Sequence, residues 1–134
     1  MSSQQGRIVS SRASIKDMAP EVFRQRLLVE GFFTTTMDEP RVRRFLLDLA
    51  AALELKTYGE PVVFAPDSGM GHDENAGFDA FVPLIDSGIS AYLWTSPAFF
   101  AVVLFTCKGF DEALAVRSIR DLLGAEGEMV THAF

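Results

Sequence analysis

Three apolar runs in close succession limit what this chain can fold into. They cover residues 78–85, 89–95 and 99–106, and only short breaks at Ser87-Gly88 and Ser96-Pro97 separate them. Each run has the length of a buried strand, and the breaks carry turn-forming residues. Connections this short join antiparallel strands, because a parallel pair needs a crossover of a dozen residues or more. The middle of the sequence therefore predicts an antiparallel meander.

Two amphipathic helices flank this meander. Val42, Phe45 and Leu49 recur at helical spacing over about residues 40–55, directly after the acidic start at Asp38 and Glu39. A second helix is predicted to begin at the capping residue Asp111 and to end just before Gly124. Its buried face consists of Leu114, Ile119, Leu122 and Leu123.

The remaining elements complete an α+β pattern. Further strands are predicted within residues 24–36, 57–66 and 128–134, with a loop at 67–77. This order predicts a two-layer sandwich, an antiparallel sheet with two helices on one face, which bury Phe45, Leu49, Ile119 and Leu122. The other sheet face is then free, and apolar residues there would favour a homodimer. Residues 1–20 read as a flexible polar tail and 21–134 as a single domain.

Composition and charge exclude several classes of function. The formal net charge of -6 repels phosphate backbones, so a nucleic-acid partner is not expected. No run of 18 apolar residues predicts a membrane span, and the N-terminus lacks the apolar stretch of a signal peptide. The single cysteine, Cys107, excludes an internal disulfide framework. We therefore expect a cytoplasmic protein.

A metal site is not expected either. His72, Asp73 and Glu74 are potential ligands in the 67–77 loop. Adjacent residues of a loop seldom converge on one ion, because a metal site needs ligands fixed by further contacts. The sequence instead predicts a solvated acidic loop.

Ser87 and Cys107 are the candidates for chemistry, and their residue types leave the interpretation open. Ser87 can belong to a simple hairpin turn between two strands. Cys107 can be a small buried residue at a strand end, or a thiol whose reactivity Lys108 promotes. Sequence spacing alone does not decide between these alternatives.

A longer stretch is more informative. Residues 77–94 read GFDAFVPLIDSGISAYLW, and residues 104–110 read LFTCKGF. These segments resemble the strand G-V-S-G-V-V-V-I-x-E-S-H-I-S-I-H-T-W-P-E and the strand ending F-T-C-G of the pyruvoyl-dependent S-adenosylmethionine decarboxylases, small bacterial and archaeal type. Ser87 falls on that family's self-cleaving serine, Asp86 on the preceding acid, and Cys107 keeps the family's spacing. Upstream, RLLVEGFF is similar to the family's opening H-L-V-A-E-F-Y.

The resemblance implies an unusual lyase. The chain would cleave itself between Asp86 and Ser87 and leave a pyruvoyl group, which serves as the electron sink for decarboxylation. Cys107 would transfer a proton to the product. Trp94, Phe78 and Asp79 are the candidate substrate contacts. The implied substrate is S-adenosylmethionine, and the implied process is polyamine (spermidine) biosynthesis.

Some positions depart from the family pattern. The family's two histidines are Gly88 and Tyr92 here, its processing serine is Asp79, and its ribose-binding glutamate is Ser96. Tyr92 would take the place of the base that promotes elimination, and a phenol is a poor base at neutral pH, so slow self-cleavage is expected. Two alternatives therefore remain. One is a pyruvoyl decarboxylase for another amino acid, and the other is an unprocessed, catalytically inactive homologue with a metabolite-binding or regulatory role.

Overall fold

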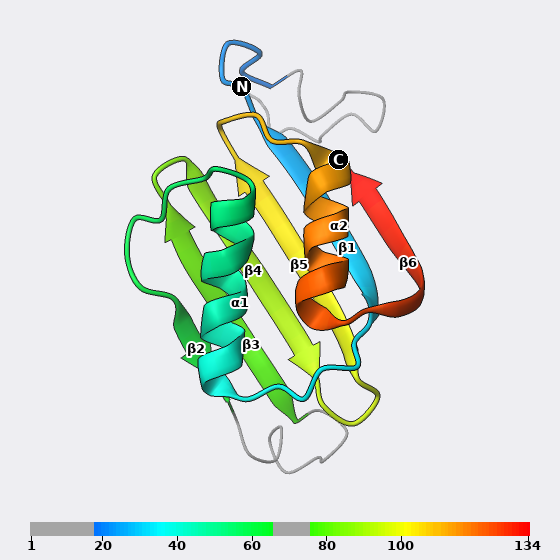
Figure 1. Ribbon diagram of the computed structural model, residues 1–134. Helices are drawn as coiled ribbons and strands as arrows, with labels where there is room; N and C mark the ends of the chain where they lie inside the picture. Colours follow the sequence, from blue (N-terminus) through cyan, green and yellow to red (C-terminus); the bar gives the residue numbers. More distant parts are fainter. Residues whose placement is uncertain (1–17, 66–75) are drawn as a thin grey trace, which may run out of the picture.

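One antiparallel sheet and two helices make up the protein, for which the computed structural model describes residues 18–65 and 76–134. The elements in chain order are β1 (Gln25–Phe32), α1 (Glu39–Ala52), β2 (Val62–Phe64), β3 (Gly77–Leu84), β4 (Ser87–Trp94), β5 (Phe99–Thr106), α2 (Glu112–Leu123) and β6 (Glu126–Ala133). The strand order is β2-β3-β4-β5-β1-β6. Both helices cover the same face of the sheet (Figure 1). The predicted two-layer α+β sandwich is therefore confirmed.

Both helices begin at the aspartates that the sequence indicates. The Asp38 side chain accepts a hydrogen bond from the Arg41 backbone N–H, and Asp111 accepts one from the Leu114 N–H. Each aspartate thus satisfies one of the backbone donors that a helix N-terminus leaves free. At the far end of α2, Gly124 has a left-handed backbone with φ of 60° and ends the helix.

The hydrophobic core lies between the helices and the sheet. Successive strand residues point to opposite faces, and every second one enters this layer. The buried strand residues include Leu27, Val29, Val82, Ile89, Leu93, Phe100, Val102 and Leu104. The helices contribute Val42, Phe45, Leu46, Leu49, Ala115, Ile119 and Leu123. Leu122 departs from the predicted set, because it lies at the margin of this layer and is only partly buried.

No helix or strand of the described residues covers the opposite face of the sheet, which we call the open face. Strand pairing arranges its side chains in rows that run across the strands. The arginine row is Pro83, Gly88, Phe105 and Arg26. The middle row is Val62, Phe81, Ser90, Val103, Leu28 and His132. The glutamate row is Phe64, Asp79, Tyr92, Ala101, Glu30 and Val130.

The hairpin between β3 and β4 corrects one expectation. A break in the meander was expected at Ser87-Gly88, but Leu84 pairs with Ser87 and the turn consists of Ile85 and Asp86. Gly88 lies inside β4, beneath the ring of Phe81. A Cβ at Gly88 would lie 2.4 Å from the nearest atom of that ring. The glycine therefore permits a close approach of an aromatic ring rather than a turn.

Two expectations lie outside the described residues. Residues 1–17 of the predicted tail and the potential ligands His72, Asp73 and Glu74 fall in the ranges 1–17 and 66–75.

The predicted last strand begins earlier than expected, at Glu126 rather than Glu128. Its pairing with β1 places it at the edge of the sheet.

A pair of glycine substitutions tests how Gly124 ends α2. Gly124 and Gly127 both have positive φ, but a Cβ at Gly124 would lie 2.6 Å from Thr34 Oγ1, whereas nothing lies within 4 Å at Gly127. Gly127→Ala should cost about 1 kcal/mol of unfolding free energy through its backbone alone. Gly124→Ala should cost a further 1–3 kcal/mol or so from the steric clash. Urea unfolding measures both values, and equal costs would contradict this account.

Candidate active site

Ser87 and Cys107 lie side by side at one end of the sheet. Ser87 is the first residue of β4 and pairs with Thr106, the last residue of β5, so Cys107 follows directly. The Ser87 Oγ and Cys107 Sγ atoms are 3.4 Å apart, within hydrogen-bond distance for sulfur. Twenty residues separate the two in the sequence. The strand pairing between β4 and β5 is what brings them together.

The carbonyl group of Asp86 is held by the same pair of strands. The Cys107 backbone N–H donates a hydrogen bond of 2.8 Å to the Asp86 carbonyl oxygen. This carbonyl belongs to the peptide bond that joins Asp86 to Ser87. A backbone N–H in this position polarises the carbonyl and stabilises negative charge that develops on its oxygen. The contact thus places a backbone donor on the carbonyl oxygen of the Asp86–Ser87 peptide bond.

The backbone of Ser87 is strained. Its φ angle is 134°, a region that side-chain-bearing residues seldom adopt. Such a conformation costs on the order of 1–3 kcal/mol and persists only where its surroundings enforce it. Here the two-residue turn on one side and the pairing with Thr106 on the other enforce it. Strain at this residue lowers the barrier to any rearrangement that releases it.

The residues after β5 keep Cys107 at the surface. The buried Thr106 donates its hydroxyl hydrogen bond to the Lys108 carbonyl oxygen, which turns the chain at this point. The Lys108 ammonium donates to the Glu54 carbonyl oxygen at 3.2 Å. It is therefore engaged at the end of α1. Cys107 itself is exposed and reduced.

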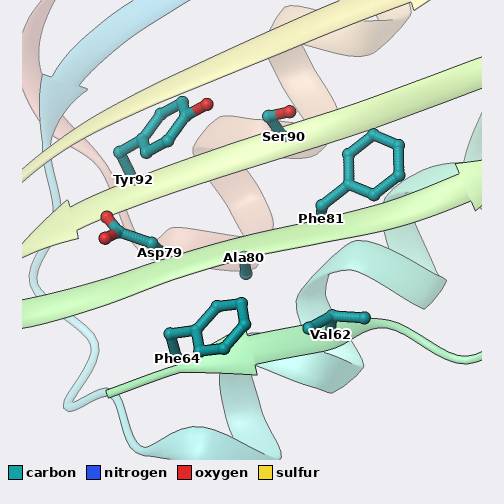
Figure 2. A pocket seen from close by; sticks show the side chains of 7 residues that line it. All are labelled: Val62, Phe64, Asp79, Ala80, Phe81, Ser90 and Tyr92. Carbon is teal, nitrogen blue, oxygen red and sulfur yellow. The ribbon is translucent and has the colours of Figure 1, made fainter. Parts of the chain in front are cut away.

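A hollow of about 360 Å³ opens on the open face, farther along β3 and β4. Figure 2 shows its lining side chains, which come from β2, β3 and β4. They are Val62, Phe64, Asp79, Ala80, Phe81, Ser90 and Tyr92. The walls are apolar and aromatic, and Asp79 is the one ionisable carboxylate among them. Sequence reasoning did not identify the hollow, although the alternation of apolar residues in β2 and β3 marks the face that it occupies.

Asp79 and Tyr92 are direct partners across β3 and β4 in this hollow. Tyr92 lies five residues along β4 from Ser87, about 16 Å at the usual rise of a strand. It was expected close to Ser87, Asp86 and Cys107, but only these three share hydrogen bonds at the end of the sheet. The Tyr92 ring extends toward Ser90 instead (Figure 2). Ser87 and Cys107 thus lie at one end of the sheet, and the hollow lies farther along β3 and β4.

The two aromatic candidates for substrate contact lie on opposite faces of the sheet. Phe78 packs against the core with the helices. Trp94 pairs with Phe99, and their rings lie 5.4 Å apart on the open face. Trp94 pairs with Gly77, so Phe78, the next residue of β3, points to the opposite face of the sheet. The two rings therefore cannot stack on the same flat group.

Other kinds of site receive no support from the described part of the chain. Within residues 18–65 and 76–134, no three histidine, cysteine or acidic side chains form a group able to hold a metal ion. In the same ranges, neither helix has the length and apolar character needed to cross a membrane. His132 is the one histidine in these ranges, and it lies on β6, with β1 and β5 between it and β4.

The fold and the paired Ser87 and Cys107 define a class: two-layer α+β sandwiches that carry a serine and a cysteine at the ends of neighbouring antiparallel strands. A search of solved structures finds a similar fold in the adenosylmethionine decarboxylase from Aquifex aeolicus VF5. Its crystal structure aligns with a TM-score of 0.63 over 84% of this chain and 89% of that chain, at 16% sequence identity. No protein-family model and no curated protein matches the sequence. The likeness therefore shows a shared fold.

Paired substitutions at Ser87 and Ser90 test the backbone strain. Ser87→Gly should be more stable than Ser87→Ala by about 1–2 kcal/mol, because only glycine adopts this φ without strain. Neither variant has a hydroxyl group, so neither can cleave the chain. At Ser90, where φ is not positive, the order should reverse by about 0.5–1 kcal/mol. Urea unfolding of the four variants measures their free energies of unfolding. If the glycine and alanine variants ranked in the same order at both positions, the assignment of strain to Ser87 would be wrong.

Proposed function

We propose that this protein is an S-adenosylmethionine decarboxylase-like protein that cleaves its own chain between Asp86 and Ser87. The observation that carries the proposal is the arrangement of three groups at one end of the sheet. The Ser87 hydroxyl lies 3.4 Å from the Cys107 thiol, and the Asp86 carbonyl accepts the Cys107 N–H. The fold shared with an adenosylmethionine decarboxylase supports the same assignment.

The cleavage uses groups of this chain and one water molecule. The Ser87 Oγ attacks the Asp86 carbonyl carbon, the C–N bond breaks, and an ester links the Asp86 acyl group to Oγ. Loss of the residue 87 α-proton then expels the Asp86 carboxylate and leaves an alkene at residue 87. This enamine takes up a proton to form an imine, and water hydrolyses the imine to a ketone and ammonia. The Cys107 N–H stabilises the oxyanion of the first step.

The residues at the strand ends fit the pyruvoyl group that this reaction would produce. Ser87 is only half buried and Cys107 is exposed, so an entering substrate can reach both. When present, the group supplies an electron sink for decarboxylation of an amino acid. Cys107 would hold the proton that is delivered to the product carbon, because its Sγ lies 3.4 Å from the Ser87 Oγ.

The hollow beside Asp79 is proposed to hold the rest of a small-molecule substrate. A volume of about 360 Å³ suits a ligand the size of an amino acid or a nucleoside. The rings of Phe64, Phe81 and Tyr92 can contact a cation through their faces, and Asp79 adds a negative charge. These features favour an amine or sulfonium ligand. They suit S-adenosylmethionine and equally a different amino acid.

An unprocessed, metabolite-binding homologue is the second candidate. One observation favours it: Tyr92 stands where the resemblance places a histidine, and its phenol lies in the hollow with Asp79. A phenol removes protons poorly at neutral pH. His132 is too far away across the sheet to replace the missing imidazole. In this case the hollow would bind a ligand without turnover.

A homodimer formed through the open face is proposed as the assembled form. Large apolar side chains on this face are exposed and continuous across the strands. They are Phe32, Val62, Phe64, Phe81, Tyr92, Phe105 and Val130. Exposed apolar surface of this extent marks an interface in soluble proteins. A second copy buries the same residues on both sides, as a two-fold interface requires.

Intact mass spectrometry tests self-cleavage. The unmutated protein should cleave slowly, and Tyr92→His should accelerate cleavage at least about 10-fold, because imidazole titrates near neutral pH. The products should be residues 1–86 and 87–134, the second lighter by one ammonia than simple hydrolysis would give. A carbonyl-reactive hydrazine should label only the second fragment.

Two controls separate the roles of the neighbours. Ser87→Ala should abolish cleavage altogether. Cys107→Ala retains the backbone N–H and should still cleave, while decarboxylation of an added substrate is lost. If the Tyr92→His protein stays intact under conditions in which it is folded, the self-cleavage proposal is wrong and the metabolite-binding alternative takes its place.

A further inference from the structure

The loop that carries Cys107 lies beyond the last paired residues of the sheet. Gln25, Thr106 and Ser87 form one row across β1, β5 and β4, and the described strand pairs of β5 end with this row. We call residues 107–110, which join Thr106 to the helix cap Asp111, the cysteine loop. Figure 1 shows this connection beside the start of β1. Because strand pairing ends at the row, side chains must fix the path of the cysteine loop.

The Gln25 side chain holds the far end of the cysteine loop at two points. Its Nε2 donates a hydrogen bond of 2.9 Å to the Phe110 carbonyl oxygen, and its Oε1 accepts one of 3.0 Å from the Phe110 N–H. Two opposed residues of an antiparallel strand pair exchange the same two bonds. A side-chain amide can therefore take the place of the next peptide group of β1, because it offers both a donor and an acceptor. The contact is partly buried and joins residues 85 positions apart.

The near end of the cysteine loop is held by Thr106. Its fully buried hydroxyl group donates a hydrogen bond to the Lys108 carbonyl oxygen. Gly109 follows and lies close to Gln25, since a Cβ on this glycine would be 3.9 Å from the Gln25 Oε1. The backbone is thus anchored on both sides of Gly109, which leaves Cys107 little freedom to move.

The position of Cys107 matters because two of its groups contact the proposed scissile bond. Its N–H donates a hydrogen bond of 2.8 Å to the Asp86 carbonyl oxygen, and its Sγ lies 3.4 Å from the Ser87 Oγ. A displacement of about 1 Å would take the N–H beyond hydrogen-bond distance of this oxygen. The path of the cysteine loop therefore decides whether the donor stays on the carbonyl group.

We propose that Gln25 is a positioning residue for self-cleavage, whose amide fixes the cysteine loop so that the Cys107 N–H stays on the Asp86 carbonyl oxygen. This rests on the proposed function and adds a residue that touches none of the reacting atoms. Without the amide, the Phe110 N–H and carbonyl group lose their partners, so the loop shifts to reach water. The oxyanion that forms when Ser87 attacks then loses its donor, which slows the first step.

Nuclear magnetic resonance tests the position of the Cys107 N–H directly. The chain has one cysteine, so protein labelled with a nitrogen isotope only at cysteine gives a single backbone amide signal. In Ser87→Ala protein, which cannot cleave, Gln25→Leu should move this signal and speed its exchange with deuterated water at least about 10-fold, because the hydrogen bond opens. Gln25→Glu keeps the size but loses the donor, and it should act in the same way. An unchanged signal in a folded Gln25 variant would overturn the proposal.

A control variant and the cleavage rate separate positioning from a general loss of stability. Ile119→Val removes a buried methylene group in the middle of α2 and should leave the Cys107 signal and its exchange unchanged. In Tyr92→His protein, adding Gln25→Leu should slow cleavage at least about 10-fold, whereas adding Ile119→Val should not. Equal cleavage rates would overturn the proposal. If the Tyr92→His protein does not cleave, the proposed function fails, and the amide signal alone decides whether Gln25 positions Cys107.

Discussion

The pairing of β4 with β5 is the contact on which the candidate site depends. It sets Ser87 opposite Thr106, and the next backbone N–H, from Cys107, then reaches the Asp86 carbonyl. A shift of one residue would turn each side chain of one strand to the opposite face and separate the serine from the cysteine. The buried Ile89, Ala91, Val102 and Leu104 exclude such a shift, because every one of them would leave the core. Core packing therefore also positions the reactive groups.

The two faces of the sheet differ in how much of their surface is buried. The face under α1 and α2 is filled with aliphatic and aromatic side chains and closes the core. The open face keeps apolar residues exposed and holds the hollow around Asp79. It also carries the buried Arg26, whose Nε and Nη2 atoms have no hydrogen-bond partner among the described residues. A chain of this size gains little from leaving such a surface in water. The proposed dimer interface and the proposed ligand site would therefore share one surface.

Sequence patterns predicted the fold well because its signals are local. Apolar runs marked the three central strands, and Asp38, Asp111 and Gly124 marked helix ends through their own side chains or backbone freedom. The proximity of Ser87 and Cys107 was predicted from the family resemblance, since spacing alone left it open. The opposite placement of Phe78 and Trp94 was missed, because it depends on how each strand pairs with its neighbours. The burial of Arg26 was missed because a single arginine in an apolar strand has no pattern of its own.

Two of the departures from the decarboxylase pattern fall on neighbouring positions of the folded chain. Asp79 and Tyr92, which stand in place of a serine and a histidine, are direct partners across β3 and β4. Ser96, in place of the ribose-binding glutamate, lies just beyond the end of β4. The groups at the other end, Ser87, Cys107 and the Asp86 carbonyl, retain an arrangement suited to cleavage. Gly88, which stands in place of the other histidine, directly follows Ser87 in β4, so the departures are not confined to the hollow. The contacts among Ser87, Cys107 and the Asp86 carbonyl follow from the pairing of β4 with β5, so they do not depend on the side chains at positions 79, 92 and 96.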